Sequence, residues 1–205
     1  MRYLVLVLAL AWTLSGFTQE APLTVAQDAP FTAAAARQSA ADAVEMLIEV
    51  NQALADHYFH TGEWDNTVTA LDRVITLRPT DVNAYANAAW LLWSTDKTDR
   101  ALAFYRRMIE NNPTNPEAYY IVGQYYFFTR RDYKEALPYL EQAVQFGITG
   151  VKRHLYGHCL KQLGRTADAL AFWRQQLADD PTNDVAKKEI EKLEKEPPPA
   201  GDAGE

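Results

Sequence analysis

The chain has 205 residues, of which 48% are hydrophobic and 23% are charged, and its formal net charge is −7. This composition is typical of a folded globular or solenoid protein and excludes a disordered chain. The negative balance argues against a nucleic-acid partner, because proteins bind nucleic acids through clustered lysine and arginine that neutralise phosphates.

Residues 1–17 have the pattern of a secretory signal peptide. Arg2 gives a short basic segment, and the apolar run from Tyr3 to Trp12 is too short to span a bilayer comfortably. Phe17 stands where a lipoprotein would carry its lipidated cysteine. We therefore expect an exported protein, periplasmic or extracellular, with no membrane span after cleavage. An uncleaved anchor or a buried N-terminal helix is the alternative.

Residues 18–31 are polar, contain proline and lack periodicity, so they are predicted to form a linker. Thr32 can cap a helix, because its hydroxyl oxygen can accept from the free N–H groups of a first turn. One long helix is predicted to start at Ala33 and to reach at least Asp56. Its early part, residues 32–47, is expected to form an N-terminal helical extension.

Three prolines mark a regular period in the rest of the chain. Pro113 follows Pro79 by 34 residues, and Pro181 lies two such periods further on. The position between them, 34 residues after Pro113, is Gly147, and glycine is another residue that ends helices. A period of this size indicates an array of helix pairs. Four repeat units are therefore predicted, at residues 48–81, 82–115, 116–149 and 150–183.

Each repeat unit is expected to contain two helices and a tight turn. In the first repeat unit Gly62 marks the turn, and the second helix is predicted to run from Trp64 to Leu77. The third repeat unit is irregular, because its small second-helix residue, Ala136, comes one residue late. The turn near Arg130 is therefore predicted to be one residue longer than in the other repeat units.

A last helix is predicted within residues 184–196. It is very polar, and Val185, Ile190 and Leu193 leave only a thin apolar stripe. The open end of a helical array needs a solvated cover, so this segment is expected to be a capping helix. Three prolines then end it, and residues 197–205 are expected to form a disordered tail.

The residues that recur in the repeat units resemble the tetratricopeptide repeat family. Small side chains at fixed positions let paired helices approach, and large ones fill the gaps between neighbouring pairs. The second repeat unit carries the pattern in Tyr85, Ala88, Ala89, Leu92, Ala101, Tyr105, Met108 and Pro113. The resemblance covers residues 48–183. It implies an all-α fold, an α-solenoid of antiparallel helix pairs in a right-handed superhelix, with the C-terminal capping helix at its end.

In this family the first helix of each repeat unit lines a concave groove, where ligands usually lie. Gln52 with Asp56, and Ala86 with Trp90, lack the positive charge with which chaperone-binding members hold a terminal carboxylate. The middle of the groove, which includes Phe128, is aromatic and suits an apolar or proline-rich segment. The predicted groove residues are Asp56, Phe59, Asn83, Trp90, Trp93, Tyr120, Gln124, Phe127, His154, His158 and Lys161.

No pattern for catalysis is found. The sequence has no Gly-x-Ser-x-Gly elbow, no glycine-rich phosphate loop after a strand and no zinc motif. His154 and His158 are four residues apart, so they could share a metal only if a third ligand came from elsewhere. We expect no metal and no cofactor. Cys159, the single cysteine, is expected to be a buried, inert thiol.

These observations predict a non-enzymatic adaptor of the cell envelope that binds a peptide or a protein partner in its groove. A self-assembling structural module is the alternative. A metal-dependent enzyme that uses the two histidines is a third, weaker possibility.

Overall fold

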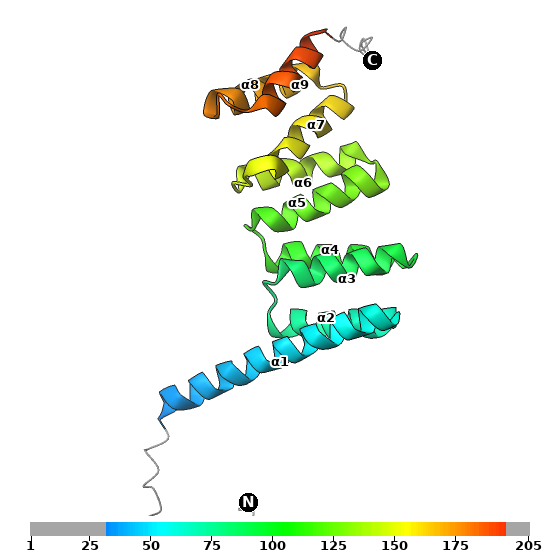
Figure 1. The fold of residues 1–205 in the computed structure, drawn as a ribbon, viewed down its shortest axis with the longest axis vertical. Coiled ribbons are helices and arrows are strands. Elements are labelled where there is room, and N and C mark those ends of the chain that lie inside the picture. Colours follow the sequence, from blue (N-terminus) through cyan, green and yellow to red (C-terminus); the bar gives the residue numbers. More distant parts are fainter. Residues whose placement is uncertain (1–31, 196–205) are drawn as a thin grey trace, which may run out of the picture. The chain divides into compact units, whose positions relative to one another are not determined.

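The computed structural model describes residues 32–195 (Figure 1). The predicted signal peptide at 1–17, the linker at 18–31 and the tail at 197–205 lie outside the described residues. Within the described range every regular element is a helix and no strand occurs. The predicted all-α fold is confirmed.

The chain divides into two compact parts, residues 1–40 and 41–205. The described residues of the first part are Thr32 and the first turns of α1 (Ala33–Thr61). The Thr32 hydroxyl accepts a hydrogen bond from the backbone N–H of Ala35 at 3.1 Å, as expected of a helix cap. All later helices, and α1 from residue 41 onward, belong to the second part.

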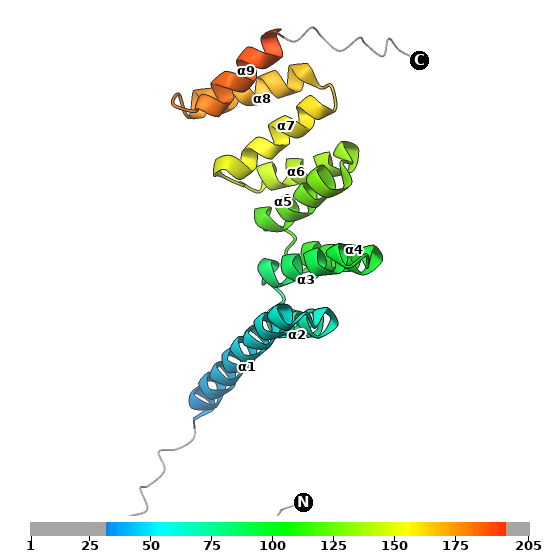
Figure 2. The same ribbon diagram turned by 45° about the vertical axis from the view of Figure 1, so that its right-hand side comes forward.

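The second part is a succession of helices joined by short connections, and each helix packs beside the next (Figures 1 and 2). This arrangement is an α-solenoid of helix pairs; the right-handed superhelix remains a prediction. The elements after α1 are α2 (Trp64–Leu77), α3 (Val82–Ser94), α4 (Thr98–Asn111), α5 (Pro116–Gln124), η1 (Tyr125–Arg130), α6 (Tyr133–Gln145), η2 (Gly150–Arg153), α7 (His154–Gln162), α8 (Thr166–Asp179) and α9 (Asp184–Lys195).

The helix ends follow the period of the sequence. The helices α2, α4, α6 and α8 each end 34 residues after the one before. In every case the proline or glycine of the sequence period comes two residues later. Proline cannot donate to the helical ladder, and Gly147 adopts a left-handed φ of 90° that most residues avoid. The division into four repeat units and a cap remains a prediction.

The third helix pair contains a π-helix, η1, which absorbs one extra residue. The helix α6 starts 35 residues after α4 and has 13 residues, whereas α2, α4 and α8 have 14 each. The extra residue was predicted to lengthen the turn, and this is wrong. Only Arg131 and Asp132 separate η1 from α6. The wider i→i+5 turns of η1 hold the extra residue inside the helix, where its backbone groups stay paired.

Small residues permit close contact within the pairs. A Cβ atom added at Gly123 of α5 would lie 2.6 Å from Leu140 Cδ2 in α6. One added at Gly157 of α7 would lie 2.6 Å from Phe172 Cδ1 in α8. The fully buried Ala136 belongs to the same contact region of the third pair. Interiors pack to crystal-like density, so these contacts fix the spacing of the helices.

Ion pairs join successive helix pairs at about one period along the chain. Arg107 of α4 donates to Asp72 of α2 at 2.7 Å, and Lys97 donates to Asp65 at 2.6 Å. Because all four side chains are partly exposed, water screens both ion pairs, and each adds little to the stability of the fold. Apolar packing therefore carries the stability of the array.

Gly123→Ala is expected to destabilise the protein by about 1–3 kcal/mol, because the added methyl group would overlap Leu140 and force the helices apart. In an unobstructed helix the same change would stabilise by roughly 1 kcal/mol, since alanine is the better helix former. Urea unfolding followed by far-UV circular dichroism measures the difference.

The control is Gln124→Ala, the next residue of the same helix, whose side chain is exposed. It is expected to change the free energy of unfolding by no more than about 0.5 kcal/mol. An unchanged or raised unfolding midpoint for Gly123→Ala would contradict the close contact.

Candidate functional site

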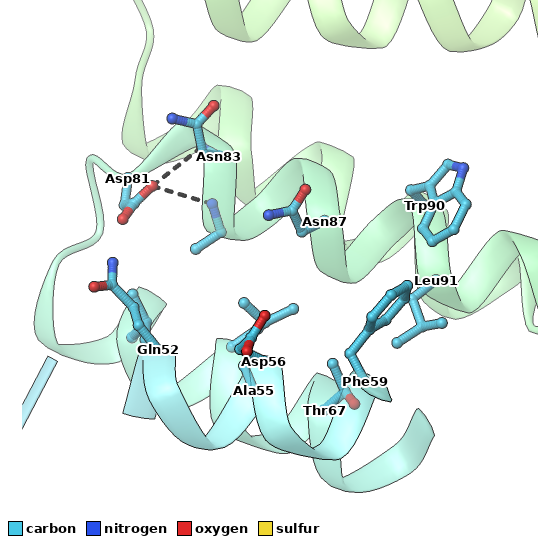
Figure 3. A pocket seen from close by; sticks show the side chains of 13 residues that line it. Gln52, Ala55, Asp56, Phe59, Thr67, Asp81, Asn83, Asn87, Trp90 and Leu91 are labelled. Atoms are coloured by element: carbon cyan, nitrogen blue, oxygen red, sulfur yellow. Dashed lines mark hydrogen bonds between the residues drawn. The ribbon is translucent and has the colours of Figure 1, made fainter. Parts of the chain in front are cut away.

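A pocket of about 370 Å³ opens between α1 and α3, with α2 beneath it (Figure 3). Its floor is apolar, since Leu71 and Val74 of α2 are 8% and 0% exposed. Its rim consists of exposed polar and aromatic side chains from the two flanking helices. We call it the first pocket. The rim residues are Gln52, Asp56 and Phe59 from α1 and Asn83, Asn87 and Trp90 from α3.

Asp81 sets the start of α3 at the edge of this pocket. Its carboxylate accepts hydrogen bonds from the backbone N–H groups of Asn83 at 3.1 Å and Ala84 at 3.0 Å (Figure 3). This N-cap satisfies donors that have no partner inside the helix. It fixes the first turn of α3, so Asn83 and Asn87, four residues apart, both line the pocket.

Asp56 extends from α1 into the space between α1 and α3 (Figure 3). Its side chain is 76% exposed, and its carboxylate lies 3.5 Å from Nδ1 of His60. The same nitrogen lies 2.8 Å from the backbone oxygen of Asp56, so the imidazole is closer to the main chain than to the carboxylate. Within residues 32–195 no lysine or arginine forms an ion pair with Asp56. The carboxylate is therefore available to a ligand.

Two aromatic rings stand together at one end of the first pocket. The ring centroids of Phe59 and Trp90 are 6.3 Å apart, and the rings are tilted by 46° (Figure 3). Phe59 also contacts Trp64 at a centroid distance of 5.6 Å. Phe59 and Trp90 are 39% and 52% exposed. Large exposed rings supplied by two different helices are typical of a binding surface.

A second pocket, of about 330 Å³, lies between α3 and η1. Trp93 of α3 and Gln124 of α5 line it together with Phe128 of η1. Trp90 and Asn87 line both pockets, so the indole of Trp90 forms a shared wall. The two pockets therefore adjoin along the face of α3, on either side of Trp90, and we call them together the groove.

The π-helix decides which phenylalanine enters the groove. Phe127, which the sequence predicted for the groove, packs instead against Tyr133, with ring centroids 5.1 Å apart. Phe128 is 59% exposed and lines the second pocket. A π turn holds more residues than an α turn, so side chains after Tyr125 are rotated relative to the regular repeat. The predicted position of Phe127 is corrected on this ground.

Tyr120 lies outside both pockets. It packs against the core of the third pair, and the ammonium of Lys152 lies 5.4 Å from its ring centroid. Asn87, which lines both pockets, was not predicted from the sequence. Its spacing of four residues from Asn83 and three from Trp90 could have placed it on the same helical face. Of the predicted groove residues, the pockets bring together Asp56, Phe59, Asn83, Trp90, Trp93 and Gln124.

His154 and His158 also lie outside the two pockets. Each imidazole packs against Trp173 of α8 with ring centroids 5.2 Å apart. Nδ2 of Asn183 lies 3.4 Å from Nε2 of His154. The helix α9 contributes Leu193 to the same core. Lys161 follows on α7, near this group and away from the pockets.

Burial lowers the pKa of both histidines below the ordinary value of 6.5. For His158 the charge of Glu189 opposes this shift, while the charges of His154, Lys192 and Lys161 add to it. Residues 32–195 contain no cluster of three or more histidine, cysteine, aspartate or glutamate side chains suited to a metal ion.

Cys159 is fully buried in α7, and its thiol lies 3.3 Å from the backbone oxygen of Tyr133. Burial raises the pKa of the thiol to about 11, because an apolar surrounding disfavours the thiolate. This agrees with the expected inert thiol.

Two family profiles match the sequence. Residues 53–116 match the profile described as tetratricopeptide repeat. Residues 94–175 match the profile described as anaphase-promoting complex, cyclosome, subunit 3. The chain is a tetratricopeptide repeat protein. No curated protein matches the sequence of this tetratricopeptide repeat protein significantly.

Several solved structures share the fold. A crystal structure of MamA has a TM-score of 0.55 at 17% identity, over 72% of this chain and 80% of that one. PilF of Pseudomonas aeruginosa has a TM-score of 0.54 at 18% identity, over 74% and 69%. YrrB, a tetratricopeptide repeat protein, has a TM-score of 0.50 at 21% identity, over 68% and 72%. At these identities the similarity establishes the fold alone.

The helices of the tetratricopeptide repeat protein are too short or too polar to cross a bilayer, as far as residues 32–195 are concerned.

The tetratricopeptide repeat protein is expected to lose stability as the pH falls through about 6.5. Burial lowers the pKa of His154 and His158, so below their ordinary pKa the unfolded chain binds more protons than the folded chain. The loss should level off below the folded pKa values. Thermal unfolding between pH 7.5 and pH 5.5 measures this dependence.

The double variant His154→Gln/His158→Gln is expected to flatten that dependence. The control, Gln124→Ala, removes an exposed side chain without a titratable group and should keep the slope of the parent protein. Equal slopes for the parent and the His154/His158 variant would contradict the lowered pKa of the two half-buried histidines.

Proposed function

We propose that this tetratricopeptide repeat protein is a non-enzymatic scaffold that binds a peptide or a protein segment in the groove formed by the two pockets. The observation that carries the proposal is the exposed aromatic wall along that groove. Trp90 and Phe128 are 52% and 59% exposed, although burial of such rings is strongly favourable. A partner that covers them would gain this free energy.

The dimensions of the groove support the same proposal. The pockets have volumes of about 370 Å³ and 330 Å³, each enough for one or two side chains of a bound segment. The amides of Gln52, Asn83 and Asn87 stand along the rim, where they can hydrogen-bond a peptide backbone. Aromatic rings that a partner would cover, with amides along the rim, are typical of interfaces with an apolar centre and a polar rim.

The family supports the proposal as well. Proteins with tetratricopeptide repeats commonly bind proteins or peptides. YrrB, which shares the fold, is described as having an unusual peptide-binding site. We infer a comparable role here, in which the protein neither binds nucleic acid nor catalyses a reaction. The negative net charge argues against binding of nucleic acid.

We further propose that the protein acts outside the cytoplasm, in the periplasm or the extracellular space, and within an envelope assembly. The basis is the sequence of residues 1–17, with its basic start, short apolar run and small residues before Phe17. N-terminal sequencing of the protein isolated from its native cells tests this proposal. A mature chain that still begins at Met1 would contradict it.

A second candidate function is self-assembly, and the exposed apolar face of α1 favours it. Met46, Leu47 and Val50 are 65%, 50% and 49% exposed, and their spacing of three and four residues places them on one side of that helix. Such a face could pair with a second copy of the chain. Sedimentation equilibrium separates the two candidates, because a monomer at every concentration would exclude self-assembly.

Trp90→Ala and Phe128→Ala are expected to weaken capture of partner proteins from a native envelope extract by at least about tenfold, because aromatic anchors dominate interface energies. Helical content by circular dichroism should stay unchanged, since both side chains are exposed. Quantitative pull-down with the immobilised protein measures the capture.

The control variant is Phe146→Ala, which removes an aromatic ring of 36% exposure that lines neither pocket. It should capture the same partners as the parent. Undiminished capture by Trp90→Ala and Phe128→Ala would refute the groove as the binding site.

A further inference from the structure

The first pocket carries charges of one sign only. Its lining includes the carboxylates of Asp56 and Asp81, and none of its described lining residues is lysine, arginine or histidine. Asp81 is engaged with the N-terminus of α3, whereas Asp56 has only the weak contact with His60. A ligand that carries a carboxylate would be repelled here, and a cationic one attracted.

The floor and the end wall of the first pocket suit a long side chain with an apolar stem. Ala55, Leu71 and Val74 form a buried apolar surface beneath the acidic rim. The rings of Phe59 and Trp90 stand at one end, 6.3 Å apart, and aromatic rings attract cations that lie over their faces. Lysine and arginine combine these properties, because their apolar stems can be buried while the charged tip stays at a polar rim.

A purely apolar side chain suits this pocket less well. It would cover the carboxylate of Asp56 without giving it a hydrogen bond or a counter-charge, and burial of an unpaired charge is strongly unfavourable. The amides of Asn83 and Asn87 add hydrogen-bonding groups that match the several N–H donors of a guanidinium group.

The second pocket differs in this respect. No charged residue is among its described lining residues, and its walls are the rings of Trp90, Trp93 and Phe128. It therefore suits an apolar, aromatic or proline residue. Since Trp90 separates the two pockets, two neighbouring parts of one segment would enter them together.

We infer that the groove selects segments in which an arginine or a lysine, bound in the first pocket, accompanies an apolar residue bound in the second. The inference rests on the proposed peptide-binding function and adds the chemistry of the partner to it. The cation pairs with the Asp56 carboxylate and lies against the rings of Phe59 and Trp90. Removal of the Asp56 charge therefore removes the preference for a basic residue and leaves the apolar contact in place.

The test is a selection from a displayed library of random 12-residue peptides on the purified, full-length protein. The peptides that bind are expected to be enriched in a basic residue beside an apolar or aromatic one. The same selection on Asp56→Asn should lose the basic residue and retain the apolar one. Asp99→Asn, an equal change of net charge on the exposed start of α4, should retain both.

A second measurement isolates the charge. One selected peptide is synthesised with its arginine and with citrulline, which has nearly the same shape but no charge. Isothermal titration is expected to give at least tenfold weaker binding of the citrulline peptide to the parent protein, and a much smaller difference for Asp56→Asn. The arginine peptide should also bind more weakly as the salt concentration rises.

Enrichment without a basic residue, or a basic preference that Asp56→Asn retains, overturns this inference and leaves the proposed peptide-binding function intact. If no peptide is enriched at all, the inference and the proposed function fail together. Equal affinities of the two synthetic peptides for the parent protein would also overturn the inference.

Discussion

Helices within a pair come close together only where a side chain is small or missing, and this contact supports the rest of the structure. Gly123 lies against Leu140, and Gly157 lies against Phe172 and Trp173, with no room for a further carbon atom. Because the small residues recur at a fixed period, successive pairs present the same face. The groove arises from this repetition: α1, α3 and α5 with η1 contribute neighbouring walls, and α2 provides a floor.

The one irregular pair shapes the functional surface. An extra residue in a helix would normally shift every later residue out of phase. Here η1 absorbs it, and α6 is one residue shorter, so the next pair begins in register. Within η1 the extra residue rotates the side chains, and Phe128 rather than Phe127 faces the second pocket. π-Helical turns occur frequently at functional sites, and this one borders the proposed groove.

The fold could be predicted largely from the sequence because its signals are local. Proline and glycine end helices through their own backbone chemistry, so the limits of α2 and the end of α8 follow from nearby residues. The course of η1 could not be predicted in this way. Whether an extra residue enters a loop or a helix depends on the packing of both helices of the pair, which one sequence does not reveal.

The candidate site was predicted in part for a similar reason. The positions of Asp56, Phe59 and Trp90 could be predicted because helical periodicity, a local property, places them on one face of the first helix of their repeat unit. His154 and His158 share that periodicity, yet they pack on Trp173 of α8, in a core to which α9 contributes. This packing is a tertiary contact, and helical periodicity carries no information about it. The division of the groove into an acidic and a neutral pocket likewise emerged only when helices distant in sequence were placed side by side.

The proposed binding of a peptide segment along α3, across the two pockets, can be tested directly. The most direct measurement uses the indole N–H signals in a ¹⁵N-resolved NMR spectrum, recorded while a peptide selected by the protein is added. The signals of Trp90 and Trp93 are expected to shift with the peptide concentration, whereas the signal of the fully buried Trp173 should stay in place. Shifts at Trp173 with unchanged signals of Trp90 and Trp93 would contradict binding in the groove, because they would place the ligand beside α8 and α9.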